Sequence, residues 1–357
     1  MTRPRLATLA GAVLLVALIA GGAPAALAAA GGAATDAAMP GAAATDTAPT
    51  RRPLVVIVAN NSGAETTDLL VPFAVLHDAD VADVRIVAVT DGPVALMPGL
   101  TILPNATLAD LVGPPAVAIV PAMHDATAAP LLAAVRRWAE DGVLVVSVCD
   151  GAWVLANAGV LDGRSATSHW YSIASLRRSH PRTRWRQDAR WVRDGNVITS
   201  AGVSASLPLA SHLVELLRAG REEDAHALGP AHDGERFAVR AADVAIAARN
   251  YLLPWRREVL GVPIADGVDE LALGTTLDLL DRTYAVRTIT EAATSPVRGR
   301  RGLRLVPDHV GGPAPATDRT IAIGAGDFDS LLAGIEARWD AATRSFVALQ
   351  IEYPPGL

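Results

Sequence analysis

Continuous apolar runs alternate with helix-like stretches through the middle of this 357-residue chain. Runs of this kind are typical of strands buried on both faces of a sheet, and they occupy residues 54–61, 84–91, 99–105, 116–123, 143–149 and 196–202. Helices are expected at 66–78, 130–141 and 204–220, and a hairpin at 184–195. The alternation predicts an α/β fold with a doubly wound parallel sheet over residues 53–220.

Two helix ends carry local signals. Thr66 or Thr67 is the expected N-cap of the first helix, because a hydroxyl can accept a hydrogen bond from a free backbone N–H. Gly220 is expected to end the last helix of this domain in a left-handed conformation.

The N-terminus has the layout of a secretory signal. Arg3 and Arg5 precede an almost wholly apolar run at 6–21, and small residues follow up to Ala28. The run is slightly long for a cleaved signal and slightly short for a membrane span, so residues 1–28 are expected to be either a cleaved signal or a retained membrane tether. Residues 29–52 have the low complexity of a disordered linker. Either way, a location outside the cytoplasm is expected.

Composition excludes several classes of function. The net charge of −6 does not favour binding to nucleic acid, which usually needs a basic surface. All 31 basic residues are arginine. A single cysteine excludes an internal disulfide and a cysteine-based zinc site. The eight histidines show no metal-binding spacing and there is no phosphate-binding glycine loop, so no metal and no cofactor are expected.

The C-terminal part resembles the first domain in plan. After a partly helical connector at 221–265, residues 266–357 are expected to form a degenerate half-copy. Residues 269–352 follow residues 68–149 at an offset of 201 to 203, with Asp269 opposite Asp68 and Trp339 opposite Trp138. The segment 319–352 is expected to end in a strand, with Glu352 or a neighbour in the place of the cysteine. This half-copy is predicted to cover the first domain as an internal mimic of a dimer partner, and a homodimer is the alternative.

The cysteine, Cys149, lies where an apolar strand meets a helix. A strand that turns directly into a helix is typical of a nucleophile elbow, in which the residue at the junction projects its side chain from the turn. The free N–H groups at the start of the helix can also lower the pKa of a thiol there. Gly151 keeps that turn uncrowded. The alternative is a buried cysteine that acts as a small apolar residue.

Residues 148–170, VCDGAWVLANAGVLDGRSATSHW, resemble the elbow signature of the ThiJ/PfpI family in the class I glutamine amidotransferase-like superfamily. The nearest branch contains isonitrile hydratases and the sensor domains of arabinose-regulator-type transcription factors. The resemblance covers 54–218, and 266–352 as a degenerate copy. It implies a flavodoxin-like sheet, frequent dimers and an elbow cysteine. Asp68 falls where the hydratases carry an aspartate important for activity.

Several positions depart from the family pattern. The usual glutamate of the first helix is missing, and Glu65 is either its substitute or, as we expect, a solvated carboxylate at the helix start. Asp150 follows the cysteine, where its charge opposes thiolate formation. The loop after the third strand is bulky, reading Pro121-Ala122-Met123-His124, and the last helix begins Ala205-Ser206-Leu207-Pro208.

Two functions remain open. The first is a cysteine-dependent hydratase, lyase or hydrolase that acts on a small electrophile, such as an isonitrile or an α-oxo aldehyde. The second is a non-catalytic domain that binds a small-molecule ligand. The candidate catalytic residues are Cys149, Asp68, Asp150 and His124. The residues expected to line the ligand are Gly151, Ala122, Met123, His169 and Trp170.

Overall fold

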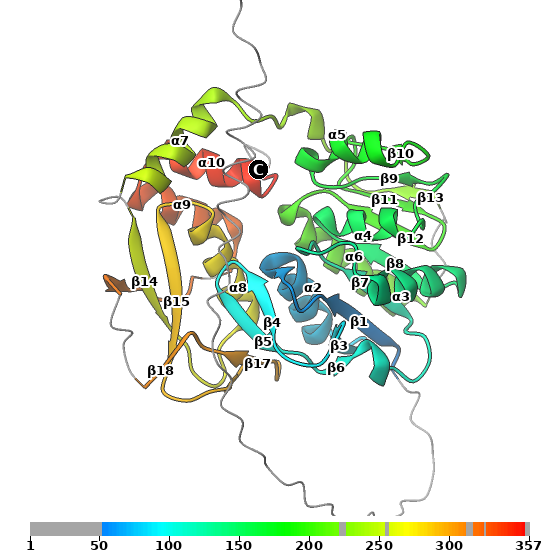
Figure 1. Ribbon diagram of the computed structural model, residues 1–357, viewed down its shortest axis with the longest axis horizontal. Helices are drawn as coiled ribbons and strands as arrows, with labels where there is room; N and C mark the ends of the chain where they lie inside the picture. Colours follow the sequence, from blue (N-terminus) through cyan, green and yellow to red (C-terminus); the bar gives the residue numbers. More distant parts are fainter. Residues whose placement is uncertain (1–51, 221–225, 254–256, 312–316, 325, 354–357) are drawn as a thin grey trace, which may run out of the picture. The chain divides into compact units, whose positions relative to one another are not determined.

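A computed structural model describes residues 52–220, 226–253, 257–311, 317–324 and 326–353. The expected signal and nearly all of the expected linker lie outside these residues. The described chain forms a first lobe, residues 54–228, a connecting helix α7 (Ala241–Leu252) and a second lobe, residues 258–353 (Figure 1).

The first lobe is built on an eight-stranded sheet with the order β13-β11-β12-β8-β7-β1-β3-β6. All neighbouring strands are parallel except at β11, which is antiparallel to both of its neighbours. The strands are β1 (Leu54–Ala59), β3 (Asp83–Ala88), β6 (Ala106–Thr107), β7 (Val117–Val120), β8 (Leu144–Ser147), β11 (Trp191–Asp194), β12 (Val197–Ser200) and β13 (His226–Leu228). The predicted doubly wound α/β fold is confirmed, as a mixed and mostly parallel sheet.

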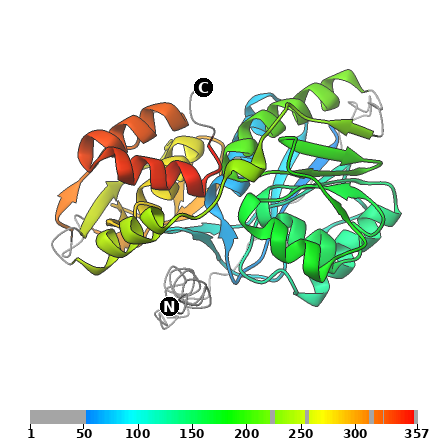
Figure 2. The ribbon, with the colours of Figure 1, turned by 90° about the horizontal axis from the view of Figure 1, so that it is seen from above.

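Helices cover both faces of this sheet (Figure 2). They are α2 (Thr66–Asp78), α3 (Ala129–Glu140), α4 (Ala152–Asn157), α5 (Trp170–Ser179) and α6 (Ser206–Ala219). Strand β1 shows why its sequence is apolar throughout. Val55 and Ile57 belong to the core under α2 and α6, whereas Val56 and Val58 belong to the core under α3. Alternate side chains of one strand point to opposite faces, so both faces need apolar residues.

Of three local expectations for the first lobe, one is confirmed and two are wrong. Gly220 ends α6 with a left-handed φ of 55°, as predicted. The N-cap of α2 is Glu65, not Thr66 or Thr67, because its carboxylate accepts from a backbone N–H of the first turn. The hairpin joins β11 to β12 over 191–200 rather than 184–195. Arg184–Trp185 (β10) instead pairs in parallel with Ser165–Ala166 (β9).

The second lobe has the same order of elements as the first part of the first lobe. Its sheet order, β18-β15-β14-β19, matches β6-β3-β1-β7. The elements are β14 (Glu258–Pro263), α8 (Glu270–Asp281), β15 (Val286–Ala292), β18 (His309–Val310), β19 (Arg319–Thr320), α9 (Phe328–Arg338) and α10 (Ala341–Gln350). The lobe begins with a strand at 258, earlier than the expected 266. A common origin of the two lobes stays a prediction.

The prediction of a strand at the end of the second lobe is wrong. Residues 341–350 form helix α10, which starts at the N-cap Asp340 and buries Thr343, Phe346 and Val347. These buried positions repeat with helical spacing, and the capping aspartate sets the start. Glu352 therefore follows a helix and does not occupy the place of the elbow cysteine. Asp269, as the N-cap of α8, occupies the place of Glu65 rather than that of Asp68.

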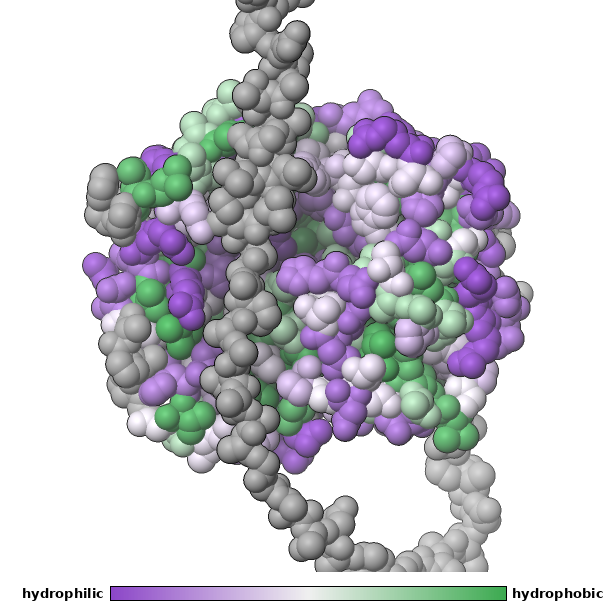
Figure 3. Space-filling view, in the orientation of Figure 1, coloured by the Kyte–Doolittle hydropathy of each residue, from purple (hydrophilic) through white to green (hydrophobic). Residues whose placement is uncertain are grey.

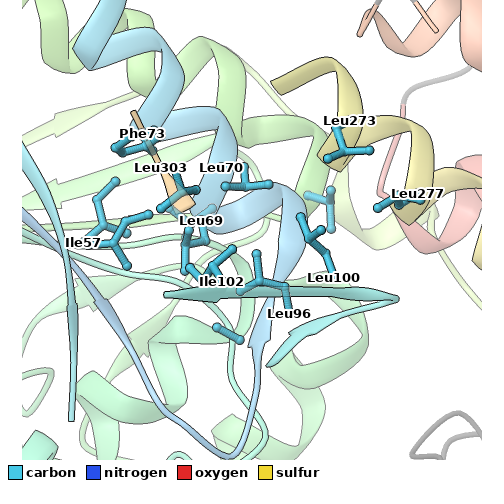
Figure 4. Packing of buried hydrophobic residues seen from close by; sticks show 14 of the residues in the cluster. Ile57, Leu69, Leu70, Phe73, Leu96, Leu100, Ile102, Leu273, Leu277 and Leu303 are labelled. Carbon is cyan, nitrogen blue, oxygen red and sulfur yellow. The ribbon is translucent and has the colours of Figure 1, made fainter. Parts of the chain in front are cut away.

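Matching hairpins of the two lobes join in a second sheet, with the order β16-β17-β5-β4-β2. Its strands are β2 (Ala64–Glu65), β4 (Val94–Met97), β5 (Leu100–Leu103), β16 (Val297–Arg298) and β17 (Arg304–Val306). Leu305 faces Ile102 in the antiparallel pair β17–β5, and Leu303 lies beside them against α2 (Figure 4). The two lobes thus share one apolar core.

The surface outside this core is mixed in polarity. On the face shown in Figure 3, apolar residues appear in groups between hydrophilic ones. Folded proteins commonly expose apolar atoms in this way, so such groups alone mark no binding site.

Candidate functional site

Cys149 occupies a strained elbow directly after β8. Its φ is 54°, a left-handed value that is uncommon for any residue with a side chain. A short 3-10 helix, Cys149–Gly151, leads from it into α4. A Cβ atom on Gly151 would overlap the carbonyl oxygen of Val120 and lie 3.0 Å from the carbonyl carbon of Pro121. Glycine is needed here because the elbow packs directly against the neighbouring strand.

Asp68 lies in the first turn of α2 and is completely buried. Its carboxylate accepts from the backbone N–H of Ala122 at 3.4 Å and from the hydroxyl of Ser206 at 3.3 Å. Burial raises the pKa of Asp68 to about 7, although the positive charge of Arg282 opposes that shift. Asp68 is therefore able both to accept and to donate a proton near neutral pH.

Cys149 is 5% exposed as a residue, and the pKa of its thiol is raised well above the ordinary value. Burial is the main cause, followed by the negative charges of Asp68, Asp150 and Glu65. These effects outweigh the expected help from the start of α4. The resting thiol is therefore protonated, and it needs a base when it reacts.

Asp150 is half-buried beside the start of α5. Its carboxylate accepts hydrogen bonds from the hydroxyls of Ser168 at 3.0 Å and Ser172 at 2.8 Å, and burial raises its pKa. The Ser168 hydroxyl also lies 3.2 Å from the carbonyl oxygen of Cys149. Asp150 thus ties the elbow to α5, and its charge acts on the sulfur as expected.

An arginine from the second lobe enters this group of carboxylates. Arg282 follows α8 and donates to Glu65 at 2.7 Å and to Asp278 at 2.7 Å. Asp278 also accepts from the hydroxyl of Thr67 at 2.7 Å. Glu65 is only 7% exposed, so its expected position as a solvated carboxylate is wrong. Burial raises the pKa of Glu65 well above its usual range, and the negative charge of Asp278 adds to that shift.

Sequence reasoning missed Arg282 and Asp278. A signal was present, because the two residues are one helical turn apart in a segment that is otherwise largely apolar. Ser206 was noted only as part of a changed motif, although its hydroxyl contacts Asp68.

The rings of the two candidate histidines lie against backbone carbonyl groups. His124 is exposed, and its Nδ1 lies 3.2 Å from the carbonyl oxygen of Ser62. His169 caps α5, and its Nε2 lies 3.0 Å from the carbonyl oxygen of Gln350. Of the remaining candidates, Met123 pairs with β2 through a bridge to Ala64.

Trp170 joins the end of the second lobe to the first. Its Nε1 donates to the carbonyl oxygen of Leu349 at 3.1 Å. The ring stacks on Phe237 with 6.4 Å between the centroids. The last turn of α10 therefore contacts the start of α5, the helix whose Ser172 binds Asp150.

The described ranges contain no group of three or more histidine, cysteine or carboxylate side chains that could hold a metal ion. Within the same ranges, no helix combines the length and the apolar character that a membrane crossing needs.

Most of the first lobe is similar in sequence to proteins of a known family. The model of the DJ-1/PfpI family matches residues 54–216. The isonitrile hydratase of Pseudomonas putida is 31% identical over 158 residues, which cover 42% of this chain and 66% of the hydratase. The HTH-type transcriptional regulator CdhR of Pseudomonas aeruginosa is 40% identical over 79 residues, covering 22% of this chain and 23% of the regulator.

This chain thus spans about a quarter of that regulator and just under two thirds of the hydratase. The expectation that it binds no nucleic acid stays a prediction. A solved ThiJ/PfpI family protein from Pseudomonas syringae is 27% identical, with a TM-score of 0.42, over 51% of this chain and 83% of that protein. Residues 54–216, which carry the strained elbow cysteine, therefore form a domain of the DJ-1/PfpI family.

Proposed function

We propose that this protein is a cysteine-dependent hydratase that acts on a small, uncharged electrophile of the isonitrile type. The observation that carries the proposal is the pairing of a strained Cys149 with a buried Asp68 whose pKa is about 7. Maintained strain at one residue is typical of functional sites. The similarity to an isonitrile hydratase supports the same reaction class.

The charges around the sulfur restrict the substrate. Glu65, Asp68 and Asp150 all act on the Cys149 thiol as negative charges. An anionic substrate would be repelled by them. An isonitrile carries no net charge and is small enough to suit a nearly closed site.

The reaction balances with these residues alone and one water molecule. The Asp68 carboxylate accepts the thiol proton as the sulfur of Cys149 bonds to the terminal carbon of the isonitrile. Asp68 then gives that proton to the same carbon, which leaves a thioimidate on the sulfur. Water adds to this carbon and the carbon–sulfur bond breaks. One proton of the water ends on nitrogen and the other on sulfur, which releases an N-substituted formamide.

The second lobe contributes Arg282 to the surroundings of this site. We infer that it acts as an internal partner, because Arg282 reaches across to Glu65 and the two hairpins share one sheet. The positive charge of Arg282 also limits the rise in the pKa of Asp68.

We expect Cys149→Ser to lower kcat/KM for cyclohexyl isocyanide by at least about 1000-fold, because the nucleophile is lost. Asp68→Asn should lower it by about 100- to 10,000-fold, the usual range for a lost acid–base group. Activity should rise as the pH increases through about 7, where Asp68 becomes ionised. The measurement is formamide production, followed by chromatography between pH 5 and 9.

His124→Ala is the matched control for this experiment, since its ring lies against the Ser62 carbonyl, and it should retain near-normal activity. Equal losses in all three variants would contradict the assignment. The burial of the sulfur favours a second candidate, a ligand-binding domain without catalysis. That candidate replaces the first if isonitriles and α-oxo aldehydes are not turned over and iodoacetamide labels Cys149 only in denaturant.

We also propose that the chain is exported, on the basis of the two arginines and the apolar run at its start. Expression of the full chain in a bacterial host should place the folded protein outside the cytoplasm. N-terminal sequencing near residue 28 should then separate cleavage from a retained membrane tether. Recovery of an uncut protein from the soluble cytoplasm would contradict export.

A further inference from the structure

A cavity of about 510 Å³ lies between the connecting segment and α10. Its walls include Arg236, Phe237 and Arg240 from the segment that leads into α7, with Arg344 and Tyr353 from the end of the chain. Helices α7 and α10 lie side by side in both ribbon views (Figures 1 and 2). Neither Cys149 nor any carboxylate near its sulfur is among the lining residues. The volume falls within the usual range for small-molecule sites.

The cavity is positively charged in a protein whose net charge is −6. Three arginines line it, with Asp243 as the single carboxylate. Asp243 is already engaged, because it accepts from the backbone N–H of Arg240 at 2.7 Å at the start of α7. Arg344 makes one partly exposed ion pair, at 3.4 Å, with Glu336. Among the residues that the structure describes, the guanidinium groups of Arg236 and Arg240 form no ion pair.

The cavity also has an apolar wall. Phe237 is 9% exposed, and its ring stacks with those of Trp170 and His232, with centroid distances of 6.4 and 5.7 Å. Tyr353 is held by a 2.8 Å hydrogen bond from its hydroxyl to Asp329. Rings fixed in this way offer a preformed surface to the body of a ligand.

We propose that this cavity binds a small organic anion, with a carboxylate or phosphate head between the arginines and an apolar body against Phe237. Planar guanidinium groups pair well with both kinds of head, and they remain charged at any physiological pH. This ligand differs from the substrate proposed for Cys149, because the carboxylates around that sulfur would repel an anion. The second site therefore serves a different molecule.

The test is titration calorimetry on the full chain at low salt with four probes: benzoate, phenyl phosphate, uncharged benzamide and inorganic phosphate. At least one of the two aromatic anions should bind with a stoichiometry of one. Benzamide should bind at least tenfold more weakly than that anion, because the charge is absent. Inorganic phosphate should also bind at least tenfold more weakly, because it has no apolar body. The stronger of the two anions identifies the preferred head group.

The double variant Arg236→Gln/Arg344→Gln should weaken binding of the preferred anion at least tenfold. Arg137→Gln is the matched control, because it removes an exposed arginine on α3 and should leave binding unchanged. Cys149→Ser should also leave binding unchanged, which separates this proposal from the catalytic one. The proposal is overturned if neither aromatic anion binds at millimolar concentration, if benzamide binds as well as benzoate, or if the double variant binds like the wild type.

Discussion

Arg282→Met should lower the free energy of unfolding by about 3–5 kcal/mol at pH 8, the usual effect of removing one partner from a buried ion pair. The variant leaves Glu65 and Asp278 buried without the guanidinium that contacts both. Methionine has a similar length and keeps the apolar part of the packing. Urea unfolding followed by tryptophan fluorescence measures the change.

The loss should be smaller at pH 5 than at pH 8. Burial raises the pKa of Glu65 in the folded protein, so the folded state holds a proton that the unfolded state releases above about pH 4.5. Stability therefore falls as the pH rises through this window. The positive charge of Arg282 lowers the pKa of Glu65 in the folded protein, so this pKa is higher still in the variant. The decrease in stability with rising pH therefore continues to higher pH in the variant.

Arg300→Met is the matched control. Arg300 also bridges the lobes, through Asp78, and pairs with Asp269 of its own lobe, but its side chain is 56% exposed. Exposed pairs usually contribute about 0–1 kcal/mol, so little change is expected. The double variant Glu65→Gln/Arg282→Met should be more stable than Arg282→Met at pH 8, because it removes one unpaired charge. Similar losses for Arg282→Met and Arg300→Met would show that the buried network contributes no more than a surface pair.

Gly151→Ala should destabilise the protein by about 3 kcal/mol or more, at or above the upper end of the usual effect of overpacking. The added carbon would overlap the backbone of Val120, which is fixed within the central strand β7. Backbone in the middle of a sheet cannot yield as a side-chain end can. Relief of the overlap would have to displace the elbow, so iodoacetamide should also react faster with Cys149. Urea unfolding and the labelling rate are measured on the same sample.

Gly334→Ala is the control, and it should change the free energy of unfolding in the opposite direction. Gly334 lies inside α9, and a Cβ atom there would have no atom within 4 Å beyond its chain neighbours and the nearby backbone of its own helix. Alanine stabilises a helix interior by about 0.8–1.0 kcal/mol relative to glycine. A small stabilisation is therefore expected. Equal effects of the two substitutions would mean that the elbow does not pack against β7 as closely as described.

The elements of the first lobe were predictable because each is specified locally. Strand β1 is apolar at every position since both of its faces are covered, and α6 ends at a glycine that adopts a left-handed conformation. The same local reasoning failed at residues 341–350. Their apolar residues were aligned with a strand by sequence offset, although their own spacing and the N-cap Asp340 favour a helix.

The environment of the site was less predictable than its residues. Cys149, Asp68 and Asp150 were identified from the sequence. In the structure, the charges of both aspartates act on the thiol of Cys149 and raise its pKa. Glu65 was expected in solvent because it stands at a helix start, where carboxylates are usually exposed. It is buried because a second helix, α8, packs over that start and supplies Arg282.

The amino-acid sequence alone determined the alternation of the main strands and helices in the first lobe, the elbow at Cys149 and the family, because each depends on residues close together in the chain. Only the tertiary structure decided that the thiol is buried and protonated, and that an arginine 217 residues from Glu65 balances its charge. Burial and Coulomb interaction depend on distances in space, and packing alone sets those distances. The arginine-lined cavity arises in the same way, from segments that meet only in the folded chain.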